Sequence, residues 1–152
     1  MKVMVGGTFD PIHDGHKKLL TRAFQLAGDD GLVMIGLTTD RFAGSKVHPI
    51  HPYAERERNL REFIQSSDFR AEFSIKPLDD RYGPSLTERF DALVVSEGTA
   101  EGGAEINRIR QQKGLPKVDI HQVACVLAED GRWISSTRIY RGEIDEHGRR
   151  VR

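Results

Sequence analysis

Short apolar runs alternate with segments of helical periodicity along this chain, and that alternation is what most constrains its fold. Residues 2–5 have the pattern of a buried strand that two glycines end, and a second apolar run covers residues 32–37. Between them a helix is predicted from His16 to Gly28, with an apolar face made of Leu19, Leu20, Ala23, Phe24 and Ala27. A strand, a helix and a second strand in this order favour a parallel pair.

The same alternation continues to about residue 138. Further strands are predicted over residues 71–77, 92–95 and 118–126. Helices are predicted as a short piece before Gly44, from Pro52 to about Ser66, over residues 104–112, and from residue 134 onward. The predicted fold is α/β, a Rossmann-like three-layer sandwich with a mostly parallel five-stranded sheet. Ligands of such a sheet bind at the carboxyl ends of its strands.

Size and charge narrow the class of protein. The chain has 152 residues, which suits one domain, predicted over residues 1–142 and followed by a polar C-terminal tail over 143–152. Its 23 Lys and Arg balance 23 Asp and Glu, which argues against nucleic-acid and membrane partners. The longest apolar run is too short to span a bilayer and the start lacks a secretory signal, so we expect a cytoplasmic protein. The oligomeric state stays open, with a monomer favoured.

The string GGTFDPIHDGH at residues 6–16 has the composition of a phosphate site. Its glycines would let a ligand approach the main chain, and free N–H groups at the helix start favour an anion. His13 and His16 lie about one helical turn apart, so both rings can point to the same side and donate to phosphate oxygens. Taken alone, two histidines at this spacing more often serve as a cap and a surface residue.

Metal binding by this loop is not expected. A zinc site built on His13 and His16 would need further ligands, which the single cysteine, Cys125, and the scattered remaining histidines do not supply. The single cysteine also excludes an intramolecular disulfide.

A second candidate site is the segment ISSTR at residues 134–138. Consecutive hydroxyls at a helix start can cap the helix and contact a phosphate, and Arg138 can pair with an anion in a bidentate manner. On its own, a Ser-Ser-Thr run is usually only a helix cap.

Together these two segments resemble the signature of the nucleotidyltransferase superfamily. There, a GTFDPxHxGH string binds the nucleotide triphosphate together with a later ISSTxxR-like segment. Four further segments, HPYAERERNLREFI, LDDRYGP, LVVSEGT and EINRIRQQKGL, are similar to phosphopantetheine adenylyltransferases of archaea and the equivalent domain of eukaryotic coenzyme A synthase. The resemblance extends to about residue 142. The bacterial enzymes typically have a threonine where His13 stands and an arginine where this chain reads SEGTAEGG, so that arginine is not transferred.

The resemblance implies roles for individual residues. It implies an ATP site made of Gly7, Thr8, Phe9, His13, Gly15, His16, Glu97, Ser135, Ser136, Thr137 and Arg138. It places Thr8, Lys46 and Asp80 on the acceptor, and it makes His16, His13, Lys46 and Arg138 the catalytic residues. For Glu97 and Asp80 the alternative is a cap on a neighbouring backbone turn, and for Lys46 a solvated loop lysine.

The implied reaction is transfer of AMP from ATP to 4′-phosphopantetheine, which yields dephospho-coenzyme A and pyrophosphate, with Mg²⁺ carried by the ATP phosphates. The alternatives are another acceptor, namely FMN, nicotinamide mononucleotide or glycerol 3-phosphate, and a nucleotide-binding module without catalysis. Related cytidylyltransferases tend to read RTEGISTT where this chain reads GRWISSTR, which favours ATP over CTP.

Overall fold

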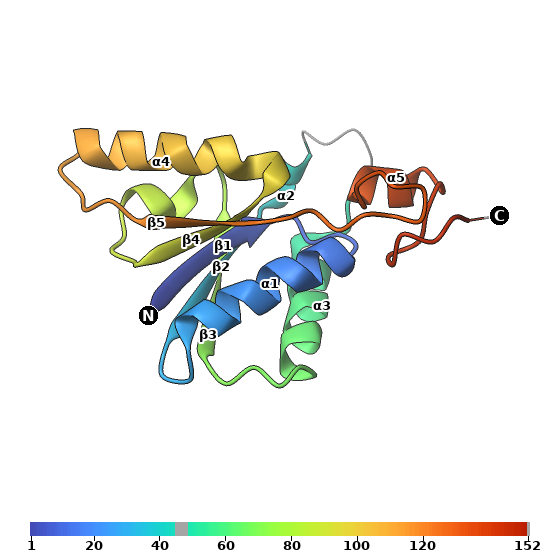
Figure 1. Ribbon diagram of the computed structural model, residues 1–152, viewed down its shortest axis with the longest axis horizontal. Helices are drawn as coiled ribbons and strands as arrows, with labels where there is room; N and C mark the ends of the chain where they lie inside the picture. The colour runs from blue at the N-terminus through green and yellow to red at the C-terminus, as the bar shows by residue number, and fades with distance from the viewer. Residues whose placement is uncertain (45–48, 152) are drawn as a thin grey trace.

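The computed structural model describes residues 1–44 and 49–151 and contains one five-stranded sheet of order β3-β2-β1-β4-β5 (Figure 1). The strands are β1 (Lys2–Gly7), β2 (Leu32–Thr38), β3 (Glu72–Leu78), β4 (Ala92–Ser96) and β5 (Asp119–Val123). Every neighbouring pair is parallel, which confirms the predicted sheet. The strand order reverses direction between β1 and β4, and such a switch point is where ligands bind in open α/β sheets.

Helices cover both faces of the sheet, as the three-layer prediction requires. They are α1 (Asp14–Ala27), α2 (Asp40–Ala43), α3 (Tyr53–Gln65), α4 (Ala100–Gln112) and α5 (Ser136–Tyr140), with 3-10 turns η1 (Gly83–Leu86) and η2 (Glu97–Thr99). In Figure 1, α1 and α3 lie on one side of the sheet and α4 on the other, while α5 stands beyond the carboxyl ends of the strands.

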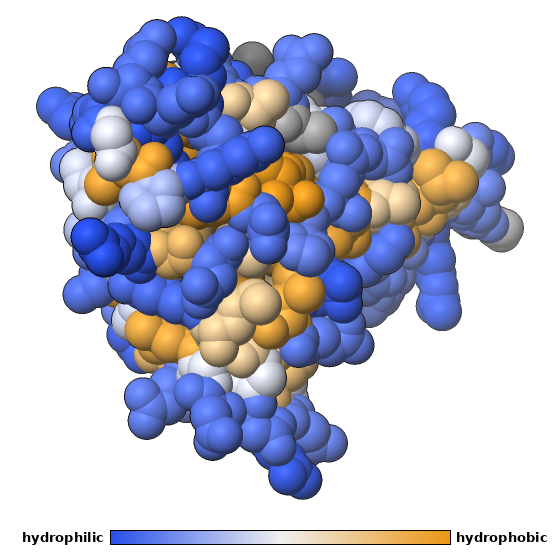
Figure 2. Space-filling model, turned by 60° about the vertical axis from the view of Figure 1, so that its left-hand side comes forward, coloured by the Kyte–Doolittle hydropathy of each residue, from blue (hydrophilic) through white to orange (hydrophobic). Residues whose placement is uncertain are grey.

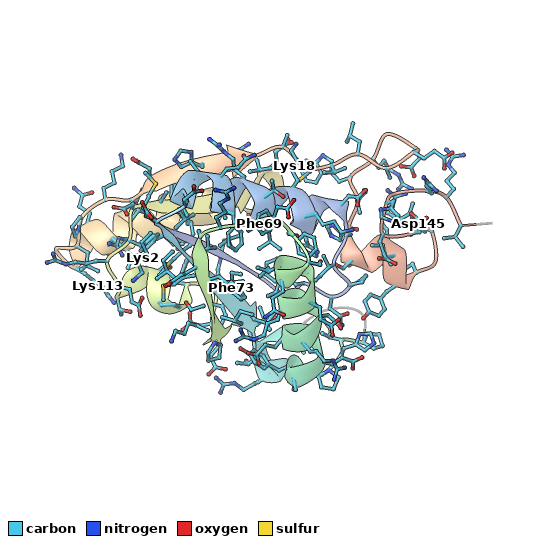
Figure 3. All side chains as sticks on the ribbon, turned by 90° about the horizontal axis from the view of Figure 1, so that it is seen from below. Lys2, Lys18, Phe69, Phe73, Lys113 and Asp145 are labelled. Carbon is cyan, nitrogen blue, oxygen red and sulfur yellow. The ribbon has the colours of Figure 1, made fainter. Side chains whose placement is uncertain are left out.

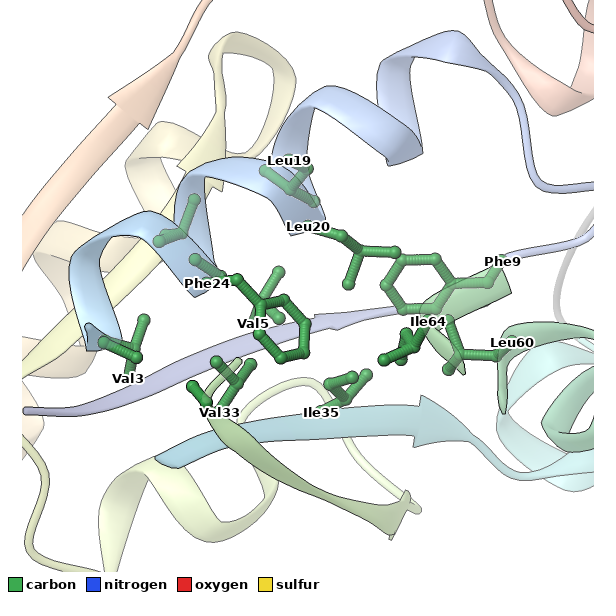
Figure 4. Close-up of a cluster of buried hydrophobic side chains, with 14 of the residues drawn as sticks. Val3, Val5, Phe9, Leu19, Leu20, Phe24, Val33, Ile35, Leu60 and Ile64 are labelled. Atoms are coloured by element: carbon green, nitrogen blue, oxygen red, sulfur yellow. The ribbon is translucent and has the colours of Figure 1, made fainter. Parts of the chain in front are cut away.

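Alternation along the strands divides the core between these two faces. Val3 and Val5 of β1 pack with α1 and α3, where the predicted apolar face of α1 is buried together with Leu60 and Ile64 (Figure 4). Phe69 and Phe73 extend this cluster beside α3 (Figure 3), and the Phe69 ring stacks on Phe24 with centroids 4.2 Å apart. Met4 points to the other face, where it joins a smaller cluster beneath α4.

Several boundaries differ from the predictions by one or more residues, and three of the differences have a local reason. Helix α1 begins at Asp14 rather than His16, because His13 caps it. Helix α4 begins at residue 100 rather than 104, and at Gly103 a side chain would lie 3.1 Å from Ile120, so the helix packs closely on β5. Strand β5 ends at Val123 rather than residue 126, because Val126 instead accepts a hydrogen bond from the Ile134 N–H.

The segment predicted as a polar tail folds back onto the domain. Ile144 is 1% exposed and packs with Ala128 and Ile134. Asp145, which lies beside α5 in Figure 3, accepts hydrogen bonds from the N–H groups of His147 and Arg149. A tail with a buried isoleucine and a closed turn is part of the packed structure as far as residue 151.

The surface carries both hydrophilic and apolar residues. On the face that Figure 2 shows, hydrophilic residues surround smaller apolar areas. None of the helices in residues 1–44 and 49–151 combines the length and the apolar character of a membrane span.

The core assignment predicts the effect of one substitution. Leu20 is 0% exposed, so Leu20→Ala should lower the free energy of unfolding by about 2–5 kcal/mol through lost burial and an unfilled cavity. The same change at Leu127, which is 58% exposed, should cost less than about 0.5 kcal/mol. Urea unfolding followed by circular dichroism measures both, and equal effects would contradict the assignment.

Candidate functional site

The loop between β1 and α1 has two special backbone features. Phe9 adopts a positive φ of 51°, and the Asp10–Pro11 peptide bond is cis. The Phe9 side chain is buried, and its ring centroid lies 5.0 Å from that of His16. Phe9, predicted to bind ATP, therefore supports the His16 ring from inside the protein.

His13 and His16 cap the start of α1 reciprocally. The His13 Nδ1 accepts from the His16 N–H, and the His16 Nδ1 accepts from the His13 N–H, both at 3.3 Å. The rings stack with centroids 3.7 Å apart, which confirms that both lie on one side of the helix entry. A side chain at position 15 would place its Cβ 2.8 Å from the His13 Cε1, so the stacked pair requires Gly15.

The start of α1 offers fewer free N–H groups than its sequence suggests. The His13 and His16 N–H groups are used in the reciprocal cap, and the Asp14 N–H donates to the Glu146 carbonyl at 3.0 Å. Within the described residues, Gly15 carries the one N–H of this first turn that has no partner. The donors open to an anion are therefore this N–H and the two histidine rings.

Burial keeps both histidines neutral. Desolvation lowers the pKa of His13 to about 4, and desolvation together with repulsion from His13 lowers the pKa of His16 to about 3. Because each Nδ1 accepts a backbone hydrogen bond, the ring hydrogen is on Nε2. At about pH 7 the pair thus presents two neutral Nε2–H donors, which can hydrogen-bond a phosphate without adding positive charge.

A buried arginine, which the sequence analysis missed, joins this loop to three other elements. Arg56 of α3 is 1% exposed and donates to the Thr8 carbonyl, the Thr38 Oγ1 and the Asp40 carboxylate at 3.0–3.3 Å. Thr38 in turn donates to the Thr8 Oγ1 at 3.0 Å. Arg56 stands in a charged stretch of the sequence, where it cannot be told from a surface residue.

The ISSTR segment forms the start of α5, and its hydroxyls act partly as predicted. Ser135 is the N-cap, and its Oγ accepts from the Arg138 N–H at 3.3 Å. Ser136 and Thr137 form the first turn and are half-buried.

The Arg138 guanidinium is occupied by protein partners. It donates to both carboxylate oxygens of Asp130 and, at 3.2 Å, to Glu143. Its side chain is 11% exposed, and it lowers the pKa of Asp130 to about 2. This pairing differs from the expected phosphate contact. In the pattern ISSTxxR the arginine position falls three residues after Thr137, where this chain has Tyr140.

Two of the remaining predicted residues, Glu97 and Asp80, are exposed and contact backbone groups, and the third lies outside the described residues. The Glu97 carboxylate accepts from the Cys125 N–H at 2.8 Å, and the Asp80 carboxylate accepts from the N–H groups of Tyr82 and Gly83. Asp80 thus caps the neighbouring turn, as its alternative role predicts, whereas Glu97 contacts the segment after β5, and binding of a ligand by either stays a prediction. Lys46 lies outside the described residues.

A cavity of about 400 Å³ lies on the α4 side of the sheet and reaches Thr8 at the carboxyl end of β1. Gly6 and Gly36, opposite each other in the β1–β2 register, leave its floor without side chains, and Gly102 of α4 lines it from above. Its apolar walls are Met4, Met34, Leu78, Leu93, Val95 and Ile106. Such a cavity suits an extended, largely apolar arm whose polar end lies near Thr8.

In the part of the chain that the structure describes, no three His, Cys, Asp or Glu side chains gather as ligands.

The parallel sheet, the reciprocally capped HxGH helix and the ISST helix define an α/β nucleotidyltransferase. The chain belongs to the cytidylyltransferase-like family, whose sequence pattern matches residues 4–142. It is 47% identical over 149 residues to a phosphopantetheine adenylyltransferase of Methanosarcina barkeri, covering 97% of this chain and 91% of that one. It is 46% identical to the protein of the same name from Methanothermobacter thermautotrophicus, covering 96% and 87% of the two chains.

A solved structure agrees with this membership. A crystal structure of a protein of unknown function from Archaeoglobus fulgidus matches with a TM-score of 0.73 at 39% identity, covering 81% of this chain and 89% of that one.

The histidine pair predicts an unusual titration. Because burial lowers both pKa values, the His13 and His16 rings should remain neutral at about pH 5, where an ordinary histidine is protonated. The unfolded chain then binds more protons below about pH 6.5, so stability should fall as the pH falls from there toward the folded pKa values. NMR of the ring carbons measures the titration, and midpoints near 6.5 would contradict the buried, neutral pair.

Proposed function

We propose that this chain transfers AMP from ATP to 4′-phosphopantetheine, producing dephospho-coenzyme A and pyrophosphate. The observation that carries the proposal is that the end of β1 lies between the two parts of the site: Thr8 lines the apolar cavity, and the ring of the next residue, Phe9, lies 5.0 Å from that of His16. One phosphorylated ligand can bind the donors while the arm of another fills the cavity. The names of the near-full-length relatives support the same reaction.

ATP is proposed to bind with its phosphates on the first turn of α1. The donors there are the Nε2–H groups of His13 and His16 and the free N–H of Gly15. The hydroxyls of Ser136 and Thr137 are retained as ligands from α5. We assign Arg138 a positioning role instead, because direct phosphate binding would require it to leave two carboxylates.

The acceptor is proposed to place its phosphate near Thr8 and its pantetheine arm along the cavity. The Thr8 hydroxyl accepts from Thr38, so its own hydrogen is available to a phosphate oxygen. Lys46 remains a proposed neutralising cation for this phosphate.

In the proposed reaction an acceptor phosphate oxygen attacks the α-phosphorus of ATP. A P–O bond forms there while the bond to the β-phosphate oxygen breaks, and pyrophosphate leaves with the electron pair. A phosphate monoester with a second pKa near 6 is mostly dianionic at neutral pH, so no general base is needed. The protein's work is to align the two phosphates and to stabilise the charge that moves onto the leaving group.

Mg²⁺ is proposed to bind mainly through the ATP phosphates and water, which fits the described residues because they gather no ligand cluster of their own. The ion would offset phosphate charge.

We further propose a cytoplasmic location without nucleic-acid or membrane partners, in keeping with the zero net charge, and we favour a monomer.

Pyrophosphate release from ATP and Mg²⁺ tests the reaction, with 4′-phosphopantetheine, FMN, nicotinamide mononucleotide and glycerol 3-phosphate as acceptors. Activity is expected with the first acceptor alone.

His16→Ala should lower kcat by about 10²–10³-fold with little change in ATP affinity, because its hydrogen bond strengthens in the transition state. His121→Ala on β5 is the control. ATP binding without turnover on any acceptor would instead indicate a non-catalytic module.

A second experiment tests the cavity assignment. Among the described residues, a Cβ added at Gly102 has only Arg81 within 4 Å, so Gly102→Leu should project into the cavity and raise the KM for 4′-phosphopantetheine at least about tenfold. The dissociation constant for ATP should not change. Gly102→Ala is the matched control, since it removes the same glycine but adds a single methyl group. An equal loss of ATP affinity in the leucine variant would refute the separation of the two subsites.

A further inference from the structure

A buried carboxylate lies where three distant segments of the chain meet. Asp10, in the loop before α1, has a side chain that is 5% exposed. It accepts from the His51 N–H at 2.6 Å, from the His51 Nδ1 at 2.9 Å and from the Tyr140 hydroxyl at 2.9 Å. The Tyr140 hydroxyl also lies 3.2 Å from the His51 Nδ1. One carboxylate thus connects the histidine loop, the segment before α3, and α5.

Burial makes this carboxylate depend on its donors. A buried charge is costly unless it is hydrogen-bonded and paired. Within the described residues, His51 is the one basic side chain that forms an ion pair with Asp10, and it does so only when protonated. His51 is itself well held, because the Arg56 Nε donates to its carbonyl at 2.8 Å. The described charged or titratable groups that act on the His51 ring are Asp10, Glu55, Arg56 and Tyr140.

Tyr140 is the residue through which α5 reaches this carboxylate. It ends a helix of five residues whose first two are Ser136 and Thr137, so a displacement of Tyr140 displaces both hydroxyls. Burial, together with the hydrogen bond to Asp10, raises the pKa of Tyr140 to about 12, so its hydroxyl keeps its proton and donates throughout the neutral range.

We propose that Asp10, His51 and Tyr140 form a latch that holds α5 against the histidine loop. All three are positioning residues: they set where Ser136 and Thr137 stand relative to His13 and His16. The kinetic consequence rests on the proposed function, whereas the latch itself exists without substrates.

The latch is expected to depend on pH. The hydrogen bond to Asp10 raises the pKa of His51 above its ordinary value. The ion pair is therefore complete below about pH 6.5 and is lost as the pH rises through the raised folded value. The contact of α5 with the loop should weaken in that alkaline direction.

Amide hydrogen exchange of residues 136–141 without substrates tests the latch directly. After correction for intrinsic rates, exchange in the unmodified protein should be faster at about pH 8.5 than at about pH 6. Tyr140→Phe should speed it about tenfold at both values, the effect of losing one hydrogen bond to a charged group. His51→Gln should remove the pH difference, whereas His51→Arg, which keeps a cation, should exchange slowly at both. His121→Gln is the control histidine.

The kinetic readout separates positioning from catalysis. Tyr140→Phe should raise the KM for ATP about tenfold while kcat stays within about twofold, because the latch assigns the hydroxyl to Asp10 and gives it no bond to the reacting phosphates. Exchange that is independent of pH in the unmodified protein, or unchanged in Tyr140→Phe, would overturn the latch. If Tyr140→Phe does not fold, His51→Gln and His51→Arg decide the question at a half-exposed position. Normal exchange behaviour without adenylyl transfer would overturn the proposed function and leave the latch standing.

Discussion

The buried guanidinium of Arg56 is the interaction on which the geometry of the site depends. A charge at 1% exposure is tolerated only where its hydrogen bonds are satisfied, and here the acceptors come from four segments of the chain. Those acceptors are the Thr8 and His51 carbonyls, the Thr38 hydroxyl and the Asp40 carboxylate. Because the guanidinium is planar, it fixes the directions of these groups as well as their distances. Arg56 thus fixes the relative positions of three segments, namely the end of β1, the end of β2 and the start of α3.

A second buried arginine connects separate segments on the opposite face of the sheet. Arg110 of α4 is 0% exposed and donates to the carbonyls of Ser85, Glu88 and Pro116. Its Nη2 has no hydrogen-bond partner among the described residues, and its guanidinium lies 4.9 Å from the centroid of the Phe90 ring. These contacts tie η1 to α4, and both elements line the cavity. A buried guanidinium therefore supports each part of the proposed site: Arg56 holds the loop between β1 and α1, and Arg110 holds the elements that form the cavity wall.

The sequence predicts periodic and local features well and tertiary partners poorly. The alternation of strand and helix patterns predicted the parallel sheet, and helical periodicity predicted the buried apolar face of α1. Both predictions use patterns that repeat every two to four residues and can therefore be recognised locally. The glycines and histidines of residues 6–16 also indicated the loop, because they lie close together in one continuous string of the sequence. Arg56, Asp10 and Ile144 could not be singled out, because their partners lie elsewhere in the chain and nothing local distinguishes a buried arginine from an exposed one. Arg138 lies in the segment predicted to bind phosphate, but its guanidinium pairs with Asp130 and Glu143, which the sequence did not indicate.

The C-terminal segment changes how an anion must be bound. A helix start is often treated as a set of free N–H groups, but here the Glu146 carbonyl takes the Asp14 N–H, and the His147 ring contacts the Asp14 carboxylate at 2.9 Å. With the reciprocal histidine cap using two more, the backbone of this turn keeps one free donor, at Gly15. The His13 and His16 rings must then supply most of the hydrogen bonds, and both are neutral in the free protein. In the proposed site these neutral donors act beside Lys46 and the Mg²⁺ that ATP carries, so the chain needs no net positive charge to hold two phosphorylated substrates.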